Sequence, residues 1–203
     1  IITSFFSNTN LLIIAILGIF LGISLFRLDE IPGEWFGDIS IINNYVLLVT
    51  SGNWPFDFIA GMGPLYAYLV APVISICGVN YYVYKLLSVT IGFLGLISIY
   101  FFAKQIVSQR VAILTMFLTA VSFWYLVWSR IGNYNIITPL LTSLMMYFFI
   151  KYIKQKKLKF LFSSILVASL GPFTYPGVFI LPLVCLTLIF YGVYRGEISK
   201  NRF

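Results

Sequence analysis

The chain has 203 residues, of which 61% are hydrophobic and only 9% charged, with a formal net charge of +7. A soluble domain carries about a quarter charged residues, so the composition excludes a soluble globular protein and predicts an all-α, polytopic membrane protein. The absence of histidine excludes His-based metal sites and His general bases. The Lys and Arg residues lie at the ends of apolar runs, and this position argues against nucleic-acid binding.

Six apolar runs predict a bundle of about six spans in one transmembrane domain over residues 1–203. They cover residues 11–26, 82–102, 111–128, 136–150, 160–173 and 178–194. Several are shorter than the ~20 residues that cross a bilayer, so we expect flanking residues to complete them. A further apolar segment, residues 65–78, is short and contains Pro72. We interpret it as an interfacial or re-entrant piece, although charge counting leaves a seventh crossing open.

Basic residues predict the orientation of this bundle. Ten of the thirteen lie on alternate loops, which the positive-inside rule places in the cytoplasm: Lys104, Arg110, Lys151, Lys154, Lys156, Lys157, Lys159, Arg195, Lys200 and Arg202. The loop over residues 27–81 and the turns at residues 129–135 and 174–177 are then on the opposite, external side.

The external loop at residues 27–81 holds five of the six carboxylates: Asp29, Glu30, Glu34, Asp38 and Asp57. Carboxylates are costly inside a bilayer, so they must lie at its surface or in a wet cavity. Asp38 is a candidate general base or divalent-metal ligand, or alternatively the cap of a helix beginning near Ile39. Asp29 and Glu30 form a second candidate, or simply end the first span.

Two further groups of residues carry side chains suited to binding a ligand. Aromatic residues before the Gly63-Pro64-Leu65-Tyr66 motif are suited to a sugar or lipid groove, or to an interfacial belt. In the turn at residues 128–135, Arg130 suits a phosphate oxyanion, and Asn133 and Asn135 offer amide donors and acceptors. Lys85 is a second cation able to reach this surface, or one that snorkels. Together these residues favour a site for an anionic lipid headgroup.

The order of these motifs resembles the GT-C glycosyltransferases of the protein O-mannosyltransferase and aminoarabinose-transferase group. The likeness spans residues 26–186. It consists of a span ending in Arg27, Pro-Gly-x-Trp-Phe-x-Asp at residues 32–38, Pro-Leu-Tyr-x-Tyr-Leu at residues 64–69, a span pair, and Ser-Arg-Ile-Gly at residues 129–132. The resemblance implies an inverting transferase that moves a sugar from a polyprenyl-phosphate carrier to a glycan, lipid or protein acceptor. It also implies membrane-parallel helices at residues 39–51 and 65–78, a prokaryotic cell-membrane location with the active loop outside the cytoplasm, and an N-terminal module of a longer protein.

The same resemblance assigns roles to particular residues. Asp38 matches the general base and is the ligand of a divalent metal ion, if one takes part. Arg130 and Lys85 would hold the lipid phosphate. Asp57 and Tyr66 would border the cleft. Glu34, Asn133 and Asn135, singled out by their chemistry, are further expected cleft residues.

The chain also departs from the family pattern. Gly37-Asp38 stands where the family often has Asp-Glu, and Asn133 or Asn135 stands where many members have an acid, which puts metal use in question. The alternative is a non-catalytic membrane subunit or transporter-like scaffold. A transporter typically has ionisable groups at mid-span, and none of the predicted spans has one near its centre.

Overall fold

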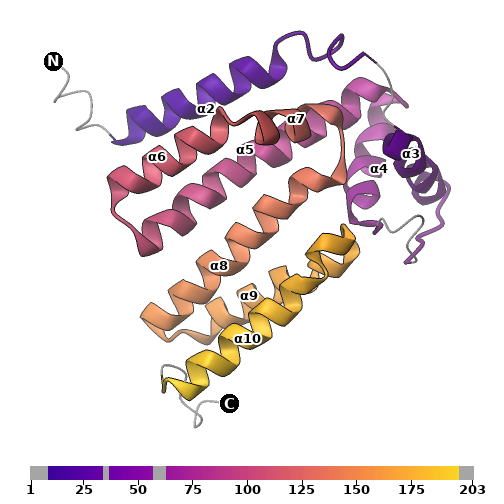
Figure 1. Ribbon diagram of the computed structural model, residues 1–203. Coiled ribbons are helices and arrows are strands. Elements are labelled where there is room, and N and C mark those ends of the chain that lie inside the picture. Colours follow the sequence, from indigo (N-terminus) through magenta and orange to yellow (C-terminus); the bar gives the residue numbers. More distant parts are fainter. Residues whose placement is uncertain (1–8, 34–36, 57–62, 197–203) are drawn as a thin grey trace, which may run out of the picture.

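The computed structural model describes residues 9–33, 37–56 and 63–196, and over these residues every regular element is a helix. The predicted all-α fold class is therefore confirmed. The helices that form the bundle are α2 (Thr9–Leu25), α5 (Tyr81–Ile106), α6 (Gln109–Ala120), α7 (Phe123–Ile131), α8 (Ile137–Gln155), α9 (Leu158–Ser169) and α10 (Ile180–Tyr194). Two further helices, α3 (Gly37–Thr50) and α4 (Leu65–Cys77), lie together at one end of this bundle (Figure 1).

Three helical stretches in the described part of the chain are long and apolar enough to cross a membrane: Tyr81–Ile106, Tyr134–Gln155 and Pro176–Tyr194. The run predicted as a span over residues 111–128 forms two helices, α6 and α7, which meet at a bend of 56°. Ser122 explains the break, since its hydroxyl accepts a hydrogen bond from the Tyr125 backbone N–H (3.3 Å) and caps a new helix there. The bent pair would be a fourth span, while α2 and Leu158–Phe173 are apolar but shorter.

Helix α5 is the centre of the bundle and packs against α2, α4, α6, α7 and α8. Small residues let its neighbours approach closely. The Tyr125 hydroxyl of α7 donates to the Gly92 carbonyl (2.6 Å), and the Ser98 hydroxyl meets the Ser143 hydroxyl of α8 (2.7 Å). Tight backbone approach and buried hydroxyl pairs thus hold the spans together where lipid provides no hydrophobic driving force.

The helices run alternately between two ends of the bundle (Figure 1). At one, which we call the acidic end, α2 and α7 finish and α5 and α8 begin. The Gly63 N–H donates to the Thr174 carbonyl (2.7 Å), so the turn after α9 also lies there. At the opposite, basic end lie the described basic residues other than Arg27, Lys85 and Arg130. The described part of the acidic loop and the two turns predicted to share its side thus occupy one end of the molecule.

Helices α3 and α4 confirm the predicted helices at residues 39–51 and 65–78, and they pack on each other at the acidic end. With 13 residues, α4 is about 20 Å long, shorter than the ~30 Å hydrocarbon core of a bilayer. The length of α4 therefore argues against a seventh crossing.

Gly132, which ends α7, is required by both backbone conformation and space. Its φ is +79°, and an added Cβ would lie 2.9 Å from the Tyr84 Cβ and 3.1 Å from the Lys85 backbone nitrogen. We expect Gly132→Ala to destabilise the fold by at least ~1–2 kcal/mol, since a left-handed backbone alone costs an L-residue that much. Thermal unfolding in detergent measures the loss.

Gly22→Ala in α2 is the matched control, because nothing lies within 4 Å of its added Cβ. This substitution should leave stability unchanged or raise it by ~0.5–1 kcal/mol. Equal melting temperatures for the two variants would contradict the close approach of the turn to α5.

Candidate functional site

Asp38 lies in the first turn of α3 and is partly exposed. The Tyr134 hydroxyl donates to its Oδ2 at 3.4 Å. Tyr134 opens η1 (Tyr134–Ile136), just after α7, whose last helical turn contains Arg130. Since α3 begins at Gly37, Asp38 lies inside the helix rather than capping a helix that begins near Ile39. The structure thus brings the acidic loop and the arginine-containing turn together.

An aromatic pair stands beside this carboxylate. The Tyr134 ring stacks on Tyr175, with ring centroids 5.5 Å apart and planes at 25°. Tyr134 is buried, whereas Tyr175 is 40% exposed. Three segments distant in sequence therefore meet here: the start of α3, the turn after α7 and the turn after α9. Sequence reasoning did not assign a role to Tyr134, although it lies between the two asparagines singled out in that turn.

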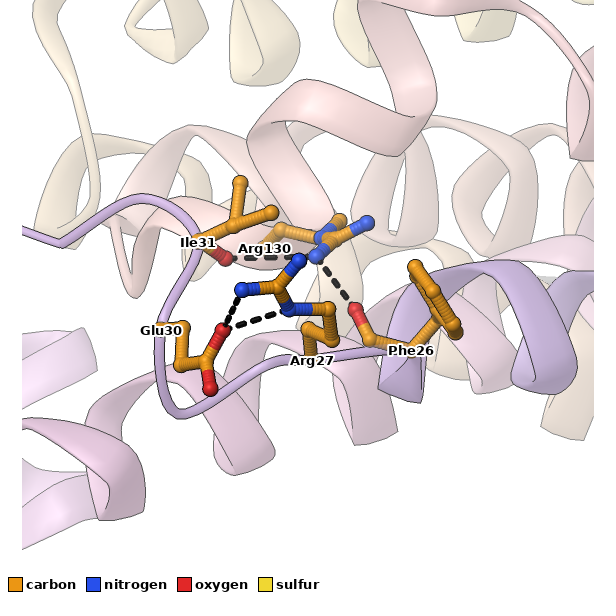
Figure 2. Close-up of polar contacts among 5 residues, drawn as sticks. All are labelled: Phe26, Arg27, Glu30, Ile31 and Arg130. Carbon is orange, nitrogen blue, oxygen red and sulfur yellow. Dashed lines mark hydrogen bonds and ion pairs between the residues drawn. The ribbon is translucent and has the colours of Figure 1, made fainter.

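The Arg130 guanidinium binds backbone carbonyls at the C-terminus of α2 and in the loop over residues 26–33 (Figure 2). It donates to the carbonyls of Ile23 (3.0 Å), Phe26 (2.7 Å) and Ile31 (3.2 Å). The last carbonyls of a helix lack intrahelical partners and carry partial negative charge. A planar guanidinium with five N–H donors suits several such acceptors at once, so Arg130 fastens the end of α2 to α7.

Lys85 binds the same loop from the other side. Its ammonium donates to the carbonyls of Leu28 (2.7 Å) and Pro32 (2.6 Å) and lies 4.5 Å from the centroid of the Tyr81 ring. The Lys85 side chain is fully buried, and these carbonyls and the ring face satisfy its charge. Both cations predicted to hold a lipid phosphate thus bind backbone carbonyls in this structure.

Arg27 forms an ion pair with Glu30 on the outside of the same loop (Figure 2). The two side chains are 58% and 53% exposed, and exposed ion pairs contribute little to stability. Among the described residues, every cation at the acidic end therefore contacts residues 23–32.

Tyr66 and Asn133, both predicted as cleft residues, are buried between helices. The Tyr66 hydroxyl donates to the Tyr84 carbonyl (2.9 Å) and lies 2.8 Å from the Ser88 hydroxyl, which joins α4 to α5. The Asn133 side-chain oxygen accepts from the Asn135 backbone N–H (3.1 Å), while its amide nitrogen is buried with no hydrogen-bond partner. These contacts shape the site, and direct substrate contact by Tyr66, Asn133 or Asn135 stays a prediction.

Glu34 and Asp57 lie outside the described residues. Within the described part of the chain, no three His, Cys, Asp or Glu side chains come together as a metal site. A divalent metal ion at Asp38 stays a prediction, because its nearest sequence partner, Glu34, is not described.

An open cleft of about 650 Å³ lies at the acidic end, between the loop at residues 26–33 and the beginning of α5. Pockets for small organic ligands have volumes of about 300–1,000 Å³. Among the described residues, Asp29 is the only acid in its lining, and Asp38 is not part of it. It is lined by Leu25, Leu28, Asp29, Gly33, Asn80, Tyr81 and Tyr82.

Comparison with known proteins gave one family match. A family model described as dolichyl-phosphate-mannose-protein mannosyltransferase matches residues 62–202. The matched part includes Tyr66, Lys85, Arg130, Asn133 and Asn135, and it begins after Asp38. No curated protein and no solved structure matches the chain significantly.

Proposed function

The chain belongs to the dolichyl-phosphate-mannose-protein mannosyltransferase family, a family of membrane glycosyltransferases of the GT-C type, and we propose that it transfers a sugar from a polyprenyl-phosphate carrier to an acceptor. The acceptor would be a glycan, lipid or protein on the non-cytoplasmic face. The observation that supports this assignment best is the meeting of the Asp38 carboxylate with the turn that follows Arg130.

Asp38 is the proposed general base. Its carboxylate would take the proton from the acceptor hydroxyl as that oxygen attacks the anomeric carbon. The bond from the anomeric carbon to the phosphate oxygen breaks, and the polyprenyl phosphate leaves with the electron pair, so the configuration inverts. The hydrogen bond from the Tyr134 hydroxyl would fix the orientation of the carboxylate. Partial exposure of Asp38 leaves it reachable from the external surface.

Arg130 is the proposed partner of the leaving phosphate. Three contacts to carbonyls leave two of the five guanidinium N–H groups for phosphate oxygens. A guanidinium whose position is fixed by hydrogen bonds to backbone carbonyls is well suited to stabilise the negative charge that develops on the departing phosphate. Lys85 would reach the phosphate only by exchanging a carbonyl contact, and it otherwise supports the loop. Glu34 and Asp57, with Tyr66, Asn133 and Asn135, complete the proposed surroundings of the substrates beside Asp38.

The charge distribution supports the proposed orientation. At least eight basic residues gather at the end opposite to Asp38: Lys104, Arg110, Lys151, Lys154, Lys156, Lys157, Lys159 and Arg195. By the positive-inside rule this end faces the cytoplasm, so Asp38 and the cleft would face outward. A prokaryotic cell membrane is the proposed location.

A transfer assay tests the function. The full-length protein, reconstituted in vesicles with polyprenyl-phosphate mannose labelled in the sugar and with native membrane extract as a source of acceptors, should release polyprenyl phosphate and form a mannoside. NMR of the product should show the anomeric configuration opposite to that of the donor. Retained configuration would contradict the direct displacement. If no mannose leaves the donor, a non-catalytic subunit becomes the better account.

A further inference from the structure

We propose that the cleft beside Asp29 is a binding site for a neutral glycosyl group, separate from the carboxylate of Asp38; this inference rests on the proposed function. Two walls form the cleft. Residues of the loop at 26–33 line one wall, with Asp29 among them, and Asn80, Tyr81 and Tyr82 at the beginning of α5 line the other.

The loop wall is held by hydrogen bonds from the two cations already described, Lys85 and Arg130. Lys85 holds the carbonyls of Leu28 and Pro32, which flank Asp29 on either side in sequence. Arg130 holds the carbonyls of Phe26 and Ile31. Four backbone carbonyls within seven residues are thus bonded to cations anchored in α5 and α7. A preorganised wall of this kind lowers the entropy that a ligand must overcome on binding.

The α5 wall is also ordered by its own hydrogen bonds. The side-chain oxygen of Asn80 accepts from the Tyr82 backbone N–H at 2.9 Å and caps the helix. Asn80 also lines the cleft, and its side-chain N–H₂ group is a hydrogen-bond donor. Tyr82, which also lines the cleft, is 40% exposed.

The chemistry of the two walls selects the ligand class. Asp29 is exposed and supplies a carboxylate acceptor, whereas Asn80 supplies an amide donor opposite it. A sugar hydroxyl donates and accepts, so adjacent hydroxyls satisfy both groups, and a tyrosine ring covers the apolar face of a pyranose. A phosphate fits poorly, because the Asp29 carboxylate repels it and the Lys85 ammonium is occupied by carbonyls. The volume of about 650 Å³ leaves room for one sugar ring and part of what it is attached to.

The glycosyl group has two sources in the proposed reaction, the donor lipid and the acceptor. Both present neutral hydroxyls to the cleft, so binding of a simple glycoside reports the site without separating them. Steady-state kinetics separates them, because loss of a contact in the cleft raises KM for the substrate whose sugar binds there.

The experiment measures binding of methyl α-mannopyranoside to the full-length protein by saturation-transfer NMR, with methyl glucoside and methyl galactoside in parallel. The protein is held in an amphipol, since detergents with maltose or glucose headgroups would compete. We expect saturable binding that inorganic phosphate does not displace. Asp29→Asn should weaken it about tenfold or more, because hydrogen bonds to a carboxylate are among the stronger ones. Tyr82→Ala on the other wall should weaken it as well.

Glu30→Gln is the matched control. Glu30 is the neighbouring carboxylate, pairs with Arg27 on the outside of the loop and does not line the cleft, so this variant should bind the glycoside like the parent. Equal affinities for Asp29→Asn and the parent, or equal losses for Asp29→Asn and Glu30→Gln, would overturn the proposal. In the transfer assay, Asp29→Asn should raise KM for donor or acceptor and leave kcat within a few-fold.

These results separate the site from the proposed function. Transfer of sugar by the parent with an unchanged KM in Asp29→Asn would refute the glycosyl site alone. Glycoside binding that depends on Asp29, in a protein that transfers no sugar, would refute the proposed function alone.

Discussion

Asp38→Asn should lower the rate of sugar transfer by ~10²–10⁴-fold, the range that general-base assistance usually contributes. The amide keeps the size of the carboxylate and still accepts a hydrogen bond from the Tyr134 hydroxyl, which lies 3.4 Å from Oδ2 in the parent. What it loses is the ability to take the proton from the acceptor hydroxyl. Initial rates with the labelled donor, compared in vesicles containing equal amounts of protein, measure the effect.

A lower transfer rate in Asp38→Asn identifies a catalytic role only if the variant is folded. Asp38 is partly exposed, so its replacement should leave the melting temperature within a few degrees of the parent. Tyr134→Phe provides a second comparison, because it keeps the ring that stacks on Tyr175 and removes only the hydroxyl. We expect a loss in kcat of less than about tenfold, with KM for the donor unchanged. Transfer at the parental rate by a folded Asp38→Asn protein would remove Asp38 from the chemistry.

Arg130→Gln should have the second largest effect, a fall of about 10²–10³-fold in kcat/KM for the sugar donor. Losses of this size are typical when a preorganised hydrogen-bonding group that stabilises transition-state charge is removed. It should also loosen the loop at residues 26–33, because Arg130 bonds the carbonyls of Phe26 and Ile31. Hydrogen exchange across this loop measures the structural part of the effect, and donor kinetics measures the catalytic part.

Two comparisons divide these contributions. Arg27→Gln makes the same change of charge in the loop that Arg130 contacts, but among the described residues Arg27 pairs with the exposed carboxylate of Glu30, so we expect kinetics within about twofold of the parent. Arg130→Lys keeps the charge and loses the planar fork, so it should recover part of the donor affinity while loop exchange stays fast. If Arg130→Gln loosens the loop and leaves donor KM and kcat unchanged, Arg130 is only a support for α2.

The sequence predicted most of the architecture, because apolar runs and the positions of charges encode it directly. Each predicted apolar run is helical over most of its length, and both short helices of the external loop were expected. The bend between α6 and α7 was missed, since the run through residues 111–128 is continuously apolar. Only Ser122 marks the break, and a serine within an apolar run is weak evidence for a cap.

The candidate site was predicted less completely. Sequence reasoning placed Asp38 and the turn of Arg130 on one side, and the structure joins them through Tyr134. It did not foresee that Arg130 and Lys85 bind carbonyls of residues 23–32, because unpaired carbonyls at a helix end leave no side-chain signature. Nor did it identify the cleft beside Asp29, which forms only where this loop folds back against the beginning of α5.

The central claim is that Asp38 and Arg130 serve one active site at the acidic end of the bundle. An experimental structure of the full-length protein with bound polyprenyl phosphate tests it most directly. We predict the phosphate within hydrogen-bond distance of the Arg130 guanidinium, with open space between it and the Asp38 carboxylate for the acceptor hydroxyl that attacks the anomeric carbon. A phosphate bound among the lysines at the basic end, with Arg130 still occupied only by the carbonyls of Ile23, Phe26 and Ile31, would contradict it.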